Sequence, residues 1–319
     1  MSSELKRVVA SRVAASFRGQ TLIDYLCSRY TYHPKEEWLR ILAAGQLKLN
    51  SSFAEPHTVL ESEDLVEYLY DEEEPEVNKN FSLLYEDDSL LVVNKPGNLP
   101  VHPSGRFFNN TLWALLKKKH DDIYFINRID RETSGIVLVA LNKAVASALG
   151  KQFQQRNVTK DYLALVEGEF PEQSIDAKGY LEKDPESEIR RKQIFREAVD
   201  FEQYGRQSVH TSFMKIRTLK EISLIKCRIH TGKTHQIRAS LQALGWPICG
   251  DKIYGLDESF YFKFIRKELT ESDWHKLRVQ RQTLHAAALD FTHPLTQESL
   301  SIEAPLPTDM QNLLAEADA

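Results

Sequence analysis

A succession of short apolar segments, rich in β-branched and aromatic residues, limits most strongly what this chain can fold into. Such segments recur between residues 81 and 229 and predict strands. Helical patterns separate only some of them, so repeated βαβ units are not expected. We therefore predict an α+β fold, with a mixed, mainly antiparallel β-sheet and flanking helices. The expected strands are Phe81–Tyr85, Leu90–Val93, Ile123–Ile126, Ile136–Leu141, Tyr162–Val166, Val209–Arg217 and Ile222–Ile229.

The first 70 residues follow another pattern. Apolar residues at helical spacing predict two helices, and two short strands follow them. The helices are expected over residues 21–30 and 35–44, and the strands over residues 47–50 and 65–70. An acidic run, Asp71–Glu76, is typical of a linker. We expect two domains, a small α/β module at residues 1–76 and a main domain at residues 77–319.

We expect an ordinary soluble globular protein, located in the cytoplasm. It has 319 residues, of which 42% are hydrophobic and 27% charged. No apolar run approaches the roughly 20 residues that span a bilayer, so no membrane association is expected. Residues 1–19 lack the apolar core of a secretory signal. The three cysteines, Cys27, Cys227 and Cys249, do not form a metal-binding pattern and are expected to be reduced thiols.

Charge is distributed unevenly. The net charge of -5 argues against a protein that coats nucleic acid nonspecifically. Acidic residues crowd residues 61–76, whereas basic residues are frequent from residue 190 to residue 238. The later part of the chain can therefore attract phosphate. A solvated surface laced with salt bridges explains the same residues equally well.

A charged loop, residues 127–135, lies between two predicted strands, and we call it the Asp130 loop. A loop held at both ends by rigid elements is a common location for catalytic side chains. Asp130 is the candidate here. On residue chemistry alone a structural turn is the more frequent explanation, because Asp, Thr, Ser and Gly are ordinary turn residues.

No cofactor is expected. Gly232-Lys233-Thr234 suggests a phosphate loop, but the glycine that this motif needs is replaced by Cys227. His230 and His235 are five residues apart, which is not a recognised metal-ligand spacing. We therefore predict neither a nucleotide nor a metal site.

Several motifs together resemble one family. Arg128-x-Asp130-Arg131-x-Thr133-Ser134-Gly135 resembles the signature loop of the RluA-type RNA pseudouridine synthases, although Asn127 and Ile129 replace the usual His and Leu. Residues 84–103, 160–168, 231–255 and 284–294 resemble further motifs of that family, in the same order. The resemblance thus extends over residues 81–305.

The resemblance implies an isomerase that converts a specific uridine of tRNA or rRNA to pseudouridine without a cofactor. It assigns catalysis to Asp130, as nucleophile or as base. Arg238 would keep Asp130 charged, unless it clamps a phosphate instead. Tyr162 would stack on a flipped-out base, unless it is only part of the strand core. Arg128 would fill the gap that the base leaves or bind the neighbouring phosphate. The residues expected to contact RNA are Arg128, Tyr162, Arg238, Arg131, Lys233 and His235.

Other readings stay open at this point. The same fold could serve a non-catalytic RNA-binding or assembly protein, or a hydrolase that cuts a glycosidic bond. Residues 1–76 loosely resemble the alpha-L-type RNA-binding domain. The expected partner is RNA, and a monomer is the default assumption.

Overall fold

The computed structural model describes residues 7–30, 33–70 and 74–318. The chain divides into two compact units. The smaller unit contains residues 1–75 with 105–107, and the larger contains residues 76–104 with 108–319. Of the acidic run predicted as a linker, Asp71–Glu73 lie outside the described residues.

In its described residues, the smaller unit has two α-helices, a short 3-10 helix and a four-stranded sheet of order β1-β4-β2-β3. Thr21 caps the first helix by accepting a hydrogen bond from the backbone N–H of Asp24. Trp38 and Leu22 are fully buried in the core that joins the helices to the sheet. The elements are β1 Arg7–Arg12, α1 Leu22–Arg29, α2 Lys35–Ala43, β2 Leu47–Leu49, β3 Ser52–Phe53 and β4 Leu65–Tyr70.

The larger unit is organised around one sheet, which has 11 strands in the described part of the chain. Its order is β11-β10-β12-β13-β9-β14-β8-β6-β5, with β15 paired to β14 and β7 to β8. All neighbours are antiparallel except β14 and β8, which run parallel. This arrangement confirms the predicted α+β class with a mixed, mainly antiparallel sheet. The strands are β5 Ser82–Glu86, β6 Leu90–Lys95, β7 Tyr124–Phe125, β8 Ser134–Ala140, β9 Thr159–Glu167, β10 Ile175–Lys183, β11 Gln193–Glu197, β12 Ser208–Leu219, β13 Ile222–Ile229, β14 Leu284–Thr292 and β15 Ser299–Glu303.

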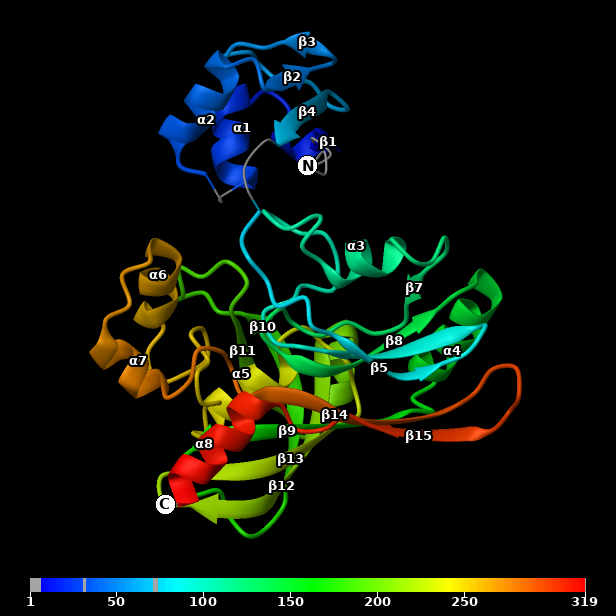
Figure 1. The fold of residues 1–319 in the computed structure, drawn as a ribbon. Coiled ribbons are helices and arrows are strands. Elements are labelled where there is room, and N and C mark those ends of the chain that lie inside the picture. Colours follow the sequence, from blue (N-terminus) through cyan, green and yellow to red (C-terminus); the bar gives the residue numbers. More distant parts are fainter. Residues whose placement is uncertain (1–6, 31–32, 71–73, 319) are drawn as a thin grey trace. The chain divides into compact units, whose positions relative to one another are not determined.

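Helices cover separate parts of this sheet (Figure 1). One apolar core lies around β6 and β8 and includes residues of α3 and α4. A second core lies around β9, β12 and β13 and includes α5. Helix α8 packs on the sheet through Met310 and Leu313. The helices are α3 Leu112–Lys117, α4 Lys143–Gln154, α5 Gln236–Ala243, α6 Ser259–Arg266, α7 Glu271–Leu277 and α8 Thr308–Asp318. Among the described residues, no helix has the length and apolar character to cross a bilayer.

The charged stretch from residue 182 to residue 202 contains a hairpin. Strands β10 and β11 pair antiparallel there, with Lys183 opposite Gln193. Gly179 allows this pairing, because a Cβ atom at that position would lie 2.0 Å from the carbonyl oxygen of Arg196. The hairpin extends the sheet beyond β12.

Candidate active site

The Asp130 loop enters β8, and buried anchors hold it. Asn127 Nδ2 donates to the carbonyl of Ile136 at 3.2 Å, and Asn127 Oδ1 accepts from the N–H of Leu138 at 2.7 Å. Ile129 is buried in the apolar core. Gly135 has φ 107°, and a Cβ atom there would lie 2.2 Å from the carbonyl oxygen of Ala286. Asn127 therefore performs a structural function, because its amide both donates to and accepts from the backbone of β8, and the loop is fixed on both sides of Asp130.

Asp130 and Arg238 meet, as the sequence predicts. Arg238 Nη1 donates to Asp130 Oδ2 at 2.9 Å. The two residues are 108 positions apart in the chain and come from the loop before β8 and from the first turn of α5. The Asp130 side chain is 30% exposed, whereas that of Arg238 is only 7% exposed. The partly exposed carboxylate of Asp130 is thus paired with the buried guanidinium of Arg238.

Asp251 is a site residue to which the sequence assigned no role. It is fully buried, and its two carboxylate oxygens accept from Arg238 Nε at 2.6 Å and Nη2 at 2.9 Å. The guanidinium plane is therefore fixed by a bidentate pair, which leaves Nη1 directed at Asp130. The ring of Tyr254 lies 4.9 Å from the guanidinium carbon. Gly250-Asp251-x-x-Tyr254-Gly255 was visible as a motif, but spacing alone did not show what it binds.

His235 also reaches the site. It occupies the left-handed conformation, with φ 59°, immediately before α5. Its Nδ1 lies 2.9 Å from the hydroxyl of Tyr254, which accepts from the N–H of Gln193. The Tyr254 hydroxyl can then donate its proton to Nδ1 of His235. The proton of the neutral His235 ring is therefore on Nε2, which lies 3.9 Å from Asp130 Oδ1. Burial and the charge of Arg238 lower the pKa of His235 to about 4, so the ring is neutral at physiological pH.

Tyr162 projects from the central strand β9 and packs against residues of both apolar cores. Burial raises the pKa of its hydroxyl, and the negative charge of Asp130 raises it further. The ring therefore lies within electrostatic reach of Asp130 and carries a hydroxyl that stays protonated. A phenolate base is excluded at physiological pH.

The remaining predicted RNA contacts lie around this centre rather than in it. Arg128 and Lys233 are exposed, and Arg131 is half-buried. Arg131 Nη2 lies 3.3 Å from Glu132 Oε1. Burial lowers the pKa of His102, and the nearby positive charge of Arg128 lowers it further. Among the described residues, the structure shows no hydrogen bond from any of these three side chains to Asp130.

A cluster of Asp176, His210 and His230 brings three possible metal-ligand atoms within 4.8 Å of one another. Two observations argue against a preformed metal site. The two imidazole rings stack with an interplanar angle of 22°, so their lone pairs do not converge on one point. The second carboxylate oxygen of Asp176 is held by Lys178 at 2.8 Å. A cation there would require rotation of a ring and would face a neighbouring ammonium.

The charge of Asp130 leads to a prediction about pH. Burial is the largest single influence and raises the pKa of this carboxyl, but the positive charge of Arg238, the hydrogen bond that it donates and the nearby His235 together hold the pKa below the usual 3.8. Because the pKa is depressed in the folded state, Asp130 stays ionised until the pH falls below the ordinary carboxyl range. We expect the turnover rate to show no loss from Asp130 protonation between about pH 8 and about pH 5. A tenfold fall per pH unit within that range, measured in single-turnover reactions on stable protein, would contradict this assignment.

Comparison with known proteins decides the family. The RNA pseudouridylate synthase family model matches residues 89–243. The ribosomal large subunit pseudouridine synthase C of Salmonella typhi is 32% identical over 328 residues, which cover 98% of each chain. The chain belongs to the RNA pseudouridine synthases. The mitochondrial tRNA pseudouridine(32) synthase of Saccharomyces cerevisiae is 34% identical over 76% of this chain, which spans about half, 52%, of that relative.

A solved structure supports the same family. The human RNA Pseudouridylate Synthase Domain Containing 1 matches with a TM-score of 0.57 and 25% identity, over 77% of this chain and 98% of that chain. The predicted family, fold class and enzyme class are therefore confirmed. An RNA pseudouridine synthase breaks the bond from C1′ to N1 of uridine and forms a bond from C1′ to C5. C5 loses a proton and N1 gains one, so the mass of the nucleotide is unchanged.

Proposed function

We propose that this RNA pseudouridine synthase isomerises specific uridines in structured tRNA or rRNA, and that Asp130 is the reacting group. The observation that carries this proposal is the pairing of Asp130 with Arg238 at 2.9 Å in a position where the carboxylate remains 30% exposed. An ionised carboxylate can attack an anomeric carbon, as in glycosidases, or remove a proton from the sugar. Both routes need the carboxylate charged and open to the substrate.

A uridine within a folded RNA must leave its stack before C1′ can reach Asp130. We propose that the enzyme flips the target nucleotide, at a cost of roughly a few kcal/mol. The ring of Tyr162, near Asp130, would stack on the flipped uracil. Arg128 is exposed on the same loop, two residues before Asp130, and would occupy the space that the base leaves or bind an adjacent phosphate.

Substitution of Tyr162 separates the function of its ring from that of its hydroxyl. Tyr162→Phe retains the ring, and we expect its single-turnover rate to stay within about tenfold of wild type, because the raised pKa makes the hydroxyl a poor base. Tyr162→Ala removes the stacking surface, and we expect its RNA affinity to fall by roughly 1–3 kcal/mol. Inactivity of a folded Tyr162→Phe would show instead that the hydroxyl takes part in proton transfer.

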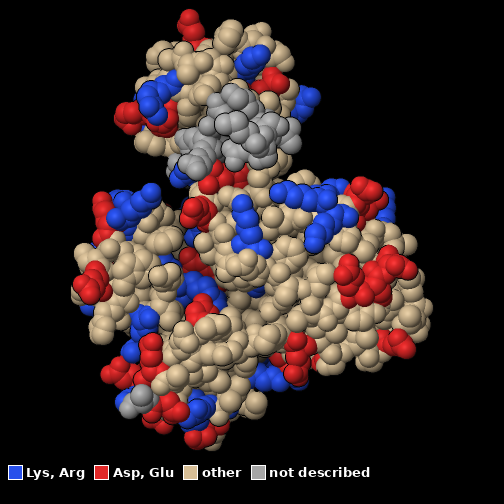
Figure 2. Space-filling model, in the orientation of Figure 1, with Lys and Arg blue, Asp and Glu red and all other residues tan. Residues whose placement is uncertain are grey.

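Basic side chains on the larger unit offer a surface for the RNA backbone. Figure 2 shows Lys and Arg gathered over α3, and the exposed Lys117, Lys118 and Lys119 lie at the end of this helix. Much of the basic stretch from residue 190 onward is instead neutralised, for example by the pairs Arg228–Asp161 and Lys192–Glu258. We propose that the RNA contacts the lysines of α3, and that the smaller unit is a separate RNA-binding domain.

Mapping of pseudouridines tests this function and identifies the RNA. Total tRNA and rRNA from cells without this protein are compared with RNA from the same cells carrying the wild-type chain or Asp130→Asn. We expect particular pseudouridines to be absent and to return only with the wild-type chain. Purified wild-type enzyme should convert the same uridines without releasing uracil. Free uracil would indicate hydrolysis of the glycosidic bond, and unchanged maps in both RNA classes would contradict the proposal.

A further inference from the structure

One short turn, residues 250–255, contacts the active site through two neighbouring side chains. Asp251 binds Arg238, the partner of Asp130. Lys252, the next residue, binds Glu132, which lies two positions after Asp130. The turn therefore holds both the cation that contacts the carboxylate and the loop that carries it.

This turn is rigid for identifiable reasons. Asp251 Oδ1 accepts from the backbone N–H groups of Ile253 and Tyr254, both at 2.9 Å. Gly250 has φ 75°, and a Cβ atom there would lie 2.2 Å from the carbonyl oxygen of Arg281. A Cβ atom at Gly255 would lie 2.0 Å from the carbonyl oxygen of Asp251. Larger residues do not fit at either glycine, so the turn is closely packed on both sides of Asp251 and Lys252.

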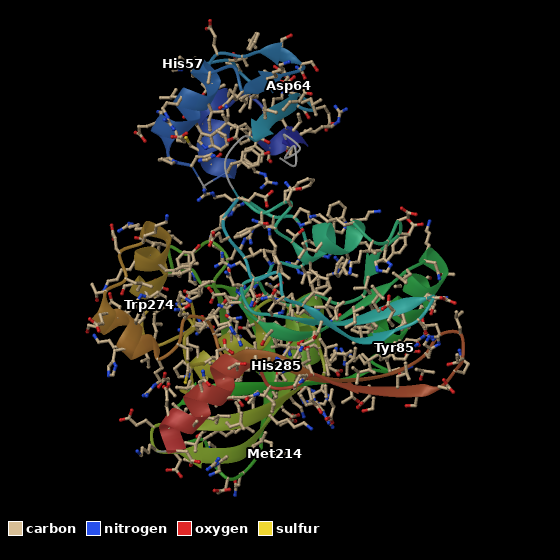
Figure 3. All side chains as sticks on the ribbon, in the orientation of Figure 1. His57, Asp64, Tyr85, Met214, Trp274 and His285 are labelled. Atoms are coloured by element: carbon tan, nitrogen blue, oxygen red, sulfur yellow. The ribbon has the colours of Figure 1, made fainter. Side chains whose placement is uncertain are left out.

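Lys252 is buried, and its ammonium is fully engaged. Its Nζ lies 3.1 and 3.3 Å from the two carboxylate oxygens of Glu132 and donates to the carbonyl of Gln280 at 2.7 Å. The rings of Phe264 on α6 and Trp274 on α7 lie 4.7 and 5.9 Å from Nζ, and Figure 3 labels Trp274. The Lys252 side chain is 3% exposed and that of Glu132 18%. An ion pair with this degree of burial is sensitive to loss of either partner.

Two other buried basic side chains hold the main chain of the same segment. Lys95 Nζ donates to the carbonyl of Arg131 at 3.2 Å, and Arg281 Nη1 donates to the carbonyl of Glu132 at 2.9 Å. These contacts act on the backbone only. The pair of Lys252 with Glu132 is the side-chain contact that links the loop to the turn carrying Asp251.

We propose that Lys252 is a positioning residue for pseudouridine formation, which sets the place of Asp130 relative to Arg238 through its ion pair with Glu132. This inference rests on the proposed role of Asp130. Lys252 does not touch the reacting atoms. Its effect arises because a displacement of about 1 Å in a reacting group can reduce a rate by about 10²-fold.

Substitution of Lys252 tests the inference on full-length enzyme with its mapped RNA. Lys252→Met keeps the aliphatic stem against Phe264 and Trp274 but removes the charge. We expect its single-turnover rate to fall by about 10- to 100-fold with RNA affinity unchanged, because the loop shifts while the RNA-binding surface does not. Lys252→Arg keeps a positive charge beside Glu132, and we expect its rate to lie above that of Lys252→Met but below wild type, because the larger guanidinium differs in shape from the ammonium.

A second pair of variants keeps the test decisive if Lys252→Met folds poorly. Glu132→Gln removes the other charge, and we expect a similar fall in rate. The double variant Lys252→Met with Glu132→Gln should lose no more than either single variant, because both remove the same interaction. Additive losses would contradict the proposal, and so would a wild-type rate in a folded Lys252→Met or Glu132→Gln.

Lys263→Met is the matched control. Lys263 forms an ion pair with Asp273 at 2.9 Å between α6 and α7, and within the described part of the chain no hydrogen bond or ion pair joins it to the Asp130 loop. We expect this variant to turn over like wild type. If Lys263→Met lost as much of the single-turnover rate as Lys252→Met, the loss would come from destabilised packing of α6 and α7. That result would overturn the inference. Activity of Asp130→Asn in the same assay would show separately that the proposed function of Asp130 is wrong.

Discussion

Asp130→Asn should bind RNA with wild-type affinity and produce no detectable pseudouridine. The amide keeps the shape of the side chain and can still accept a hydrogen bond from Arg238, but it can neither attack C1′ nor take up a proton. Because Asp251 continues to neutralise Arg238, no buried charge is left unpaired and the fold should persist. We expect the single-turnover rate to fall by about 10⁴-fold or more, which is the size of loss seen in enzymes when the reacting side chain is removed.

Asp161→Asn is the matched control for that variant. Asp161 is also a buried carboxylate bound to an arginine, at 2.7 Å from both Nε and Nη2 of Arg228, and it precedes Tyr162 on β9. Successive strand residues point to opposite faces, so Asp161 lies on the face away from Tyr162. We expect Asp161→Asn to remain active within about threefold. Appreciable turnover by Asp130→Asn would remove this carboxylate from the mechanism.

Arg238→Ala should lose both activity and stability. Without the guanidinium, burial would raise the pKa of Asp130 and protonate it, because burial already opposes ionisation in the wild-type protein. We expect the rate near neutral pH to fall by about 10²- to 10³-fold and to recover partly as the pH is raised. Asp251 would also be left buried without its partner, which costs about 3–5 kcal/mol of folding free energy. A pH–rate profile and urea unfolding measure the two effects separately.

Arg217→Ala provides the control, because Arg217 pairs with Asp318 at the surface, where both side chains are more than half exposed. Such a pair contributes roughly 0–1 kcal/mol, so rate and stability should stay near wild type. An Arg238→Ala variant with an unchanged rate would show that Asp130 does not depend on this cation. Loss of stability with an unchanged pH profile would limit Arg238 to a structural role.

The sequence predicted those elements whose core side chains are large and apolar. Strands β6, β8 and β13 and helices α1 and α2 lie close to their expected positions, because Val, Ile and Leu recur in them at strand or helix spacing. Strand β10 was missed. Its inward residues include Ala177 and Gly179, and charged residues stand between them, so its apolar signal is weak. Strand order could not be predicted, because register across long separations depends on packing in three dimensions.

The site was predictable in part. Asp130, Arg238, His235 and Tyr162 come together as expected, since recognisable motifs contain them. Asp251 and Lys252 were missed, because a single sequence does not show which buried cation a given carboxylate meets. Glu132 likewise reads as an ordinary loop acid, and its partner lies 120 residues away. Contacts of this kind become visible only when distant segments are folded against each other.

Titration of the Asp130 carboxyl carbon by NMR tests the central claim most directly. Spectra of protein labelled at Asp carboxyl carbons are compared with those of Asp130→Asn, which assigns the signal by its absence. The paired guanidinium predicts a signal of ionised carboxylate from about pH 8 to about pH 5, with a midpoint below the ordinary carboxyl value of about 3.9. A midpoint between about pH 5 and pH 8 would show that Arg238 does not keep this group charged, and would contradict the account.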